Sequence, residues 1–230
     1  MTDTRFDVLG IGNAIVDVIA ETSDDFLGTH DLIKGSMRLI DEDEAGRIYD
    51  GMGPGTEVSG GSAANTIAGV AALGGRGSFV GKVRDDQLGD VFAHDIRAQG
   101  VSFTTPTAAE GPLTARCMVL VTPDAQRTLN TFLGAAIGIS VNDLDPADVA
   151  ASKVTYLEGY LWDAPAGPAL FAAAATAAAA AGQEVAMTLS DPFCVDRHRT
   201  DFLAFIREHV DIVFANEDEV ISLYEADNFD

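Results

Sequence analysis

Three polar side chains in the first 65 residues have the chemistry to bind a polyhydroxy ligand: Asn13, Asp17 and Asn65. A carboxylate accepts hydrogen bonds from paired hydroxyls, and an amide offers both a donor and an acceptor. Asp17 interrupts the β-branched run 14–20, where the alternative is a solvent-facing residue on a half-buried strand. Asn13 directly follows the apolar run 6–12, so we expect it at the end of a buried strand.

The stretch Gly60-Gly61-Ser62-Ala63-Ala64-Asn65 predicts a sharp turn into a helix that begins at Ser62 or Ala63. Two glycines let the backbone turn and leave space for a ligand. Ser62 is the expected N-cap. Asn65 then lies about one turn into the helix, near its positive end. The alternative is a glycine turn with a capped, buried helix and no ligand.

Elements that would position these residues follow a regular alternation. Strand-like runs at 6–12, 77–83, 153–158, 184–189 and 210–215 alternate with helix-like runs, among them 166–181, 199–208 and 217–225. This rhythm predicts βαβ units and a parallel sheet. Polar or glycine residues fall at many of the predicted strand ends, where such sheets bind ligands.

The stretch 101–130 breaks the alternation. Residues 114–121 and 127–132 flank a turn-like segment and predict a β-hairpin. Together with the runs 14–20 and 34–40, this hairpin would form a small sheet added to the α/β body.

Composition narrows the class of protein. The chain of 230 residues carries 14 basic and 36 acidic residues, a net charge of −22, which disfavours nucleic acid and anionic membranes as partners. Cys117 and Cys194 are far apart, so a reducing compartment is expected. The start of the chain has no signal-peptide pattern. The alanine-rich tract from Ala169 to Ala181 is too short and too weakly apolar to span a bilayer.

Gly10-x-Gly12 invites comparison with the dinucleotide-binding fingerprint of NAD-dependent dehydrogenases. The third glycine of that fingerprint would fall at Ile15, and a β-prone run follows instead of a helix. A dehydrogenase is therefore a remote alternative.

Five motifs in order resemble the ribokinase-type (PfkB) carbohydrate and nucleoside kinases, especially adenosine-kinase-like members. They are Gly12-Asn13-Ala14-Ile15-Val16-Asp17, the Gly60–Asn65 stretch, Gly81-Lys82-Val83-Arg84-Asp85-Asp86 with Gly89-Asp90, Arg127-Thr128-Leu129, and Asn216-Glu217-Asp218-Glu219. The resemblance implies an α/β fold: a three-layer αβα ribokinase-like body with a parallel central sheet and a small β-sheet lid. Residues 1–230 would form one such domain, as its N-terminal portion. The lid segments would be approximately 14–40 and 104–132.

The resemblance also implies the site. Asp17 and Asn65 would hold sugar or ribose hydroxyls, with three further residues beside them: Asn13, Gly61 and Ser62. Leu133 and Tyr160 would wall a base or ring, with ordinary core packing as the alternative.

Asn216 and Glu219 match the family's N-x-x-E motif, which is associated with ATP phosphate and Mg²⁺. A helix start favours phosphate, and a carboxylate such as Glu219 orders waters on Mg²⁺. The alternative is a capping box, which has the same spacing.

One departure from the family affects the expected chemistry. The second family signature, a Gly-Ala-Gly-Asp-like turn that supplies the catalytic base and the anion hole, is absent, so the base is expected beyond Asp230. The implied function is ATP-dependent phosphorylation of a primary hydroxyl on a sugar or nucleoside, by a cytoplasmic enzyme that pairs as a homodimer through the lid in some relatives. We expect the 230-residue chain alone to be weakly active. The alternative is a non-catalytic sugar- or nucleoside-binding module.

Overall fold

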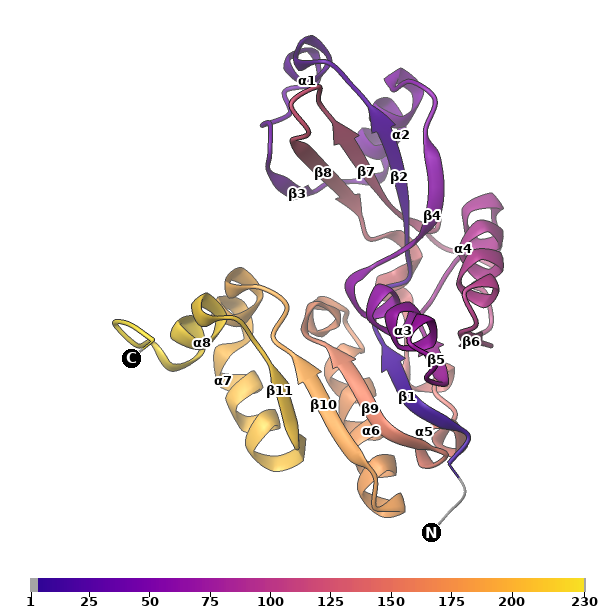
Figure 1. Cartoon of the computed structure of the whole chain (residues 1–230), viewed down its shortest axis with the longest axis vertical. Helices are drawn as coiled ribbons and strands as arrows, with labels where there is room; N and C mark the ends of the chain where they lie inside the picture. Colours follow the sequence, from indigo (N-terminus) through magenta and orange to yellow (C-terminus); the bar gives the residue numbers. More distant parts are fainter. Residues whose placement is uncertain (1–3, 230) are drawn as a thin grey trace.

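The computed structural model describes residues 4–229, which form a large and a small β-sheet, each with its own helices (Figure 1). The large sheet is wholly parallel, with strand order β11-β10-β9-β1-β5-β6. Its strands are β1 (Phe6–Ile11), β5 (Gly77–Val80), β6 (Ser102–Phe103), β9 (Ser152–Glu158), β10 (Glu184–Thr188) and β11 (Ile212–Phe214). All carboxyl ends therefore meet at one edge, as the alternation predicts.

Helices cover the two faces of the large sheet unequally. One face carries α3 (Ser62–Ala72), and α4 (Gln87–Ala98) lies beside the sheet; the opposite face carries α5 (Pro146–Ala150), α6 (Gly167–Ala181) and α7 (Pro192–His209) (Figure 1). A last helix, α8 (Glu217–Tyr224), packs on α7. Three short 3₁₀ segments complete the body: η1 (Gly134–Gly138), η2 (Val141–Asp143) and η3 (Gly159–Asp163).

The core follows from this layering. On the α6–α7 side, Trp162 meets the rings of Phe171, Phe202 and Phe205 edge-on at 5.3–5.5 Å. On the α3 side, a second aromatic cluster joins Phe79, Phe92 and Phe103. The edge-to-face contacts, those of Trp162 and that of Phe92 with Phe103, add to the free energy of burial.

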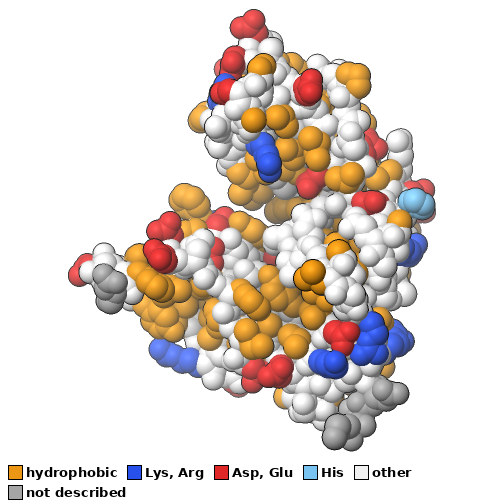
Figure 2. Space-filling view, viewed as in Figure 1, with side chains coloured by type: hydrophobic (Ala, Val, Ile, Leu, Met, Phe, Trp, Pro, Cys, Tyr) orange, Lys and Arg blue, Asp and Glu red, His pale blue; other side chains and the backbone are white. Residues whose placement is uncertain are grey.

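One part of the large sheet is poorly covered. Ile212, Val213 and Phe214 of β11 are 37%, 42% and 53% exposed, and apolar side chains crowd the visible face over β9 to β11 (Figure 2). Parallel sheets normally have helices on both faces. Within residues 4–229, β11 therefore lacks the cover that its composition calls for.

The small sheet has the order β3-β8-β7-β2-β4 and is mixed. Its strands are β2 (Ile15–Glu21), β3 (Met37–Leu39), β4 (Thr56–Gly60), β7 (Ala115–Val121) and β8 (Arg127–Phe132). The predicted hairpin is present as β7–β8. The predicted lid ranges omitted β4, which pairs with β2, and the strand expected at 34–40 is only β3. Residues 104–113 form no strand.

Two helices, α1 (Asp24–Thr29) and α2 (Glu42–Gly51), cover one face of the small sheet, with Leu27, Ile48, Met118 and Leu120 buried between them. Side chains alternate along a strand, so the residues next in sequence to Met118 and Leu120 point to the face that α1 and α2 leave uncovered, together with their partners on the neighbouring strands. That open face carries two rows across five strands: Leu39, Thr131, Cys117, Asp17 and Val58, then Met37, Leu129, Val119, Ile19 and Thr56.

Glycine is required where the chain passes between the small sheet and the body. Gly61, between β4 and α3, has φ +98°, and a Cβ there would lie 2.4 Å from the carbonyl oxygen of Asn13. Gly134, after β8, has φ +41°, and its Cβ would lie 2.1 Å from the carbonyl oxygen of Leu113. Side chains are thus excluded by both backbone angle and space.

The described part of the chain, residues 4–229, shows neither a dinucleotide-binding turn nor a helix that could span a membrane. Gly12 is followed by β2 of the small sheet rather than by a helix, so the dehydrogenase alternative lacks its structural context. Among the described residues, none of the helices combines the length and apolar character needed to cross a bilayer.

We predict opposite effects of alanine at two glycines of one segment. Gly61→Ala should lower the free energy of unfolding by at least about 2 kcal/mol, because it forces a side chain into a strained, filled position. Gly69→Ala, inside α3 with open space around it, should raise it by about 0.5–1 kcal/mol. Urea titration of both variants measures this, and a neutral Gly61→Ala would contradict the role of this turn.

Candidate active site

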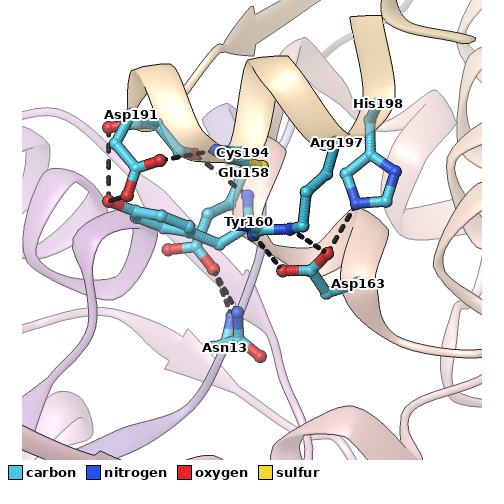
Figure 3. Close-up of polar contacts among 9 residues, drawn as sticks. Asn13, Glu158, Tyr160, Asp163, Asp191, Cys194, Arg197 and His198 are labelled. Atoms are coloured by element: carbon cyan, nitrogen blue, oxygen red, sulfur yellow. Dashed lines mark hydrogen bonds and ion pairs between the residues drawn. The ribbon is translucent and has the colours of Figure 1, made fainter. Parts of the chain in front are cut away.

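Polar groups from neighbouring strands meet at the carboxyl edge of the large sheet. Asn13 follows β1, Glu158 ends β9, and Asp191 follows β10. Figure 3 shows Asn13 and Glu158 facing each other. Tyr160, just after β9, reaches Asp191, which follows the neighbouring strand β10. The predicted meeting of polar strand ends is therefore observed for these residues.

Glu158 makes the densest set of contacts at this edge. It is 1% exposed. Oε2 accepts from the backbone N–H of Asn13 at 2.6 Å and from Asn13 Nδ2 at 2.9 Å. Oε1 accepts from the backbone N–H of Ala63 at 3.0 Å and from the hydroxyl of Ser62. The sequence prediction did not include Glu158 among the site residues, although an acid ending a buried strand was the available signal.

Ser62 does not have the predicted N-cap role. Helix α3 starts at Ser62 itself, the N-cap is Gly61, and no side chain caps it. The carboxylate of Glu158 takes the place of a cap, because it accepts from the Ala63 N–H and from the Ser62 hydroxyl. An acid from a distant strand thus meets the positive end of α3.

Asp17 lies on the open face of the small sheet, directly over Gly60. A Cβ on Gly60 would lie 2.3 Å from Asp17 Oδ2, so the glycine makes room for the carboxylate. Within residues 4–229, no group donates a hydrogen bond to that carboxylate. Burial without compensation raises the pKa of Asp17 to about 6. Its register neighbour Cys117 stays a thiol, because burial raises its pKa to about 11.

Asn65 lies on the first turn of α3 and is exposed. Asp17 overlies Gly60, and Asn65 comes four residues after Gly61, so both side chains belong to the surroundings of the same helix start. Figure 2 shows a notch between the small-sheet lobe and the body. Four surface hollows of about 330–530 Å³ lie elsewhere, and none is lined by Asp17 or Asn65. That Asp17 and Asn65 together bind the hydroxyls of one polyol remains a prediction.

Tyr160 and Leu133 occupy different settings. The Tyr160 hydroxyl donates to Asp191 Oδ2 at 2.9 Å, and its backbone N–H donates to Ser190 Oγ at 3.0 Å. Burial, together with the Asp191 carboxylate, holds the pKa of Tyr160 well above its ordinary value, so the hydroxyl stays protonated. Leu133 is partly exposed at the start of η1, where the chain returns from the small sheet. Their roles as walls for a ring remain predictions.

An ion cluster fixes η3, which carries Tyr160. Asp163 accepts from Arg197 Nη2 at 2.6 Å and lies 2.5 Å from His198 Nε2, so η3 is tied to α7 (Figure 3). The same helix α7 is capped by Asp191, which accepts from the backbone N–H of Cys194. Asp191 therefore caps α7 and holds Tyr160 at once.

Asn216 and Glu219 form a capping box at the start of α8. Asn216 Oδ1 accepts from the Glu219 N–H at 2.9 Å, and Glu219 Oε2 accepts from the Asn216 N–H at 3.2 Å. Glu219 is 5% exposed, and burial, with Asp191 and Asp218 nearby, raises its pKa. The capping alternative is thus observed.

The described residues contain no cluster of three or more His, Cys, Asp or Glu side chains that could hold a metal. An all-protein magnesium cage does not fit this part of the chain. One carboxylate at a helix start fits instead a Mg²⁺ carried by nucleotide phosphates and their waters. The magnesium role of Glu219 remains a prediction.

Solved structures match this architecture closely. A probable sugar kinase from Rhizobium etli CFN 42 gives a TM-score of 0.90 at 52% identity, and the adenosine kinase from Sinorhizobium meliloti gives 0.89 at 54%. Each match covers 98% of this chain and 69% of the other. The three-layer body with its second, mixed sheet therefore places this fold in the ribokinase-like class of α/β proteins.

Residues 50–229 match the family described as pfkB family carbohydrate kinase, and the chain belongs to that family. Adenosine kinase 2 of Arabidopsis thaliana is 28% identical over 92% of this chain. The chain spans 63% of the length of that relative. The family predicted from the five motifs is confirmed.

We predict that the desolvated Asp17 lowers stability above its pKa. Because folding raises this pKa from 3.8 to about 6, the folded state binds the proton more tightly, and stability falls as the pH rises from about 4 to 6. Asp17→Asn should therefore leave the free energy of unfolding unchanged below pH 4 and raise it by roughly 3 kcal/mol above pH 6.5.

Asp7→Asn is the matched control for this pH series. Hydrogen bonds from Arg76 and Lys153 hold the pKa of Asp7 well below its ordinary value, so its stabilising contribution is present at neutral pH and this variant should lose stability there. Urea titrations from pH 4 to 8 compare the two variants. Equal signs at pH 7 would contradict the assignment of Asp17 as an uncompensated carboxylate.

We also predict that glutamine preserves the α8 cap. Glu219→Gln keeps an oxygen for the Asn216 N–H but loses the acceptor of Asn216 Nδ2, so the free energy of unfolding should fall by no more than about 0.5 kcal/mol. Glu219→Ala should lower it by about 1 kcal/mol. Thermal and urea unfolding measure both. If the two variants behave alike, the reciprocal cap contributes nothing measurable.

Proposed function

We propose that this chain is part of an ATP-dependent phosphotransferase that acts on a primary hydroxyl of a nucleoside or sugar. The observation that carries the proposal is Asp17: a carboxylate without a hydrogen-bond donor in the described structure, placed over the glycine turn that starts α3. A group with unused acceptor capacity and a desolvation cost is suited to accept from ligand hydroxyls. A pKa of about 6 leaves it ionised at neutral pH, as an acceptor requires.

We favour a nucleoside over a free sugar. The open face of the small sheet presents Ile19, Met37 and Leu39 at 40%, 50% and 57% exposure. An aromatic base would cover such apolar side chains, whereas a free polyol would leave them in water. The matched relatives named adenosine kinase point the same way, and the relative named probable sugar kinase keeps the second class open.

The small sheet would act as the lid over the substrate. Closure of its open face onto the carboxyl edge of the large sheet would exclude water and so limit ATP hydrolysis. Pairing of two lids in a homodimer would have to use this open face or the edge strands β3 and β4, because α1 and α2 cover the other face. The cytoplasm is the compartment that we propose for the enzyme.

ATP would bind at the same edge of the large sheet, with its Mg²⁺ near Glu219 and phosphate at the start of α8. Phosphoryl transfer depends on positioning and charge stabilisation. We propose that the catalytic base, the anion hole and the cover over β11 belong to the part of the relatives that this chain does not span. Glu158 is unsuited as the base, since four protein donors occupy its carboxylate. Asp191 is unsuited because each of its oxygens already accepts from a protein donor, Tyr160 or the Cys194 N–H.

The 230-residue chain should bind adenosine saturably and turn over slowly or not at all. Calorimetry with adenosine, ribose and fructose, and an assay of ADP release with Mg²⁺ and ATP, measure the two properties. Asp17→Asn should weaken adenosine binding at least tenfold, since it removes charged hydrogen bonds. Turnover in the ordinary kinase range of about 1–100 s⁻¹ would contradict the missing base.

The same assays address the second candidate, a nucleoside-binding module without catalysis. It is favoured only by the engaged state of the two acids named above. Fusion to the corresponding C-terminal portion of the Sinorhizobium meliloti enzyme distinguishes the candidates, because a kinase should gain turnover and a binding module should not. Absence of binding to all three ligands would contradict both.

A further inference from the structure

We infer that Glu158 is the positioning residue of the substrate site: it fixes Asn13 and the first turn of α3 and does not itself contact substrate. The inference rests on the proposed function for the identity of the ligand, and on the hydrogen-bond geometry for the role. Glu158 joins three segments that are distant in the sequence: the end of β9, the connection from β1 to β2, and the start of α3.

The acceptor capacity of Glu158 is used up within the protein. An ionised carboxylate offers about four acceptor positions, two on each oxygen. Four donors occupy them: the backbone and side-chain N–H groups of Asn13, the backbone N–H of Ala63 and the hydroxyl of Ser62. No position remains for a ligand hydroxyl. This separates Glu158 from Asp17, whose acceptor positions are occupied by none of the described residues.

The surroundings leave Glu158 little freedom to turn toward a ligand. Its side chain is 1% exposed. A Cβ on Gly12 would lie 2.9 Å from Glu158 Oε2 and 2.6 Å from the Ala63 Cβ, so the backbone just after β1 lies directly against both groups. Charge-assisted hydrogen bonds in such a site are short and strong. Glu158 and its four donors, which we call the Glu158 clamp, therefore hold the three segments in one fixed arrangement.

The clamp also sets which atom of Asn13 is free. A carboxylate only accepts, so the Asn13 amide must turn its Nδ2 toward Glu158 and its Oδ1 away. That Oδ1 is buried and, among the residues described, has no hydrogen-bond partner. An unpaired buried acceptor is unfavourable until a donor arrives. Asn13 is thus oriented to accept a hydrogen bond, from a ligand hydroxyl or from a water that the ligand positions.

The test uses the 230-residue chain, with adenosine as the probe. Glu158→Gln places an amide N–H₂ against protein donors. It should speed hydrogen exchange at the backbone amides of Asn13 and Ala63 at least tenfold and weaken adenosine binding roughly tenfold or more. The matched control is Asp95→Asn, another multiply bonded acid, which accepts from Ser59 N–H and Oγ. It should change neither quantity.

A double-mutant cycle separates positioning from direct contact. If Glu158 acts through Asn13, the combined Glu158→Gln and Asn13→Ala variant should bind adenosine more tightly than the product of the two single losses predicts. Independent losses that multiply would show that Glu158 does not act through Asn13 and would overturn the inference. Unchanged adenosine binding in Glu158→Gln would overturn it as well.

Two further measurements keep the test decisive if Glu158→Gln does not fold or if no ligand binds. If Glu158→Gln fails to fold, Ser62→Ala removes one donor and should speed exchange at Asn13, on the other side of the shared carboxylate; unchanged exchange there overturns the clamp. If the unmodified chain binds neither adenosine nor a sugar, the proposed function fails. The clamp is then decided by the exchange data alone, and slow exchange retained in Glu158→Gln would overturn it.

Discussion

The site depends on one buried carboxylate that holds the ends of two parallel strands and the start of a helix together. Parallel strands bring their carboxyl ends to one edge, but this alone does not fix the loops that leave those ends. Glu158 does so with two oxygens and four donors. Helix α3 gains a charged partner at its positive end without a capping side chain of its own, and the β1–β2 connection gains a fixed course toward the small sheet.

Asp17 is the opposite kind of acid. It carries a similar charge in a partly buried place but has no described donor, and its raised pKa measures the resulting unfavourable solvation. In the function that we propose, the two acids would divide stability and recognition between them: Glu158 holds the frame, and Asp17 would receive its missing donors from the ligand. Sites that bind tightly often carry such local instability, which the rest of the fold offsets.

The parts of the fold that depend on local pattern were predictable. Apolar runs alternating with helical ones predicted the parallel sheet, and the turn-like residues at 122–126 predicted the β7–β8 hairpin. The pairing of β4 with β2 was missed, because it depends on contacts between segments some 40 residues apart. The Ser62 cap was wrong, and Glu158, although it falls at a predicted strand end, was left out of the predicted site, for one reason. The partner of the helix start comes from a strand 95 residues later, and spacing within a motif carries no information about it.

The small sheet is assembled from two separate stretches of chain, β2 to β4 and then β7 to β8, with α3, β5, α4 and β6 between them. The small sheet therefore cannot be transferred between proteins as one continuous segment of sequence. A chimaera that exchanged only residues 15–60 between relatives would pair a foreign β2 with a native β7, across the row that holds Asp17 and Cys117. If the small sheet is the lid that we propose, ligand preference could be exchanged between family members only by exchanging both stretches together.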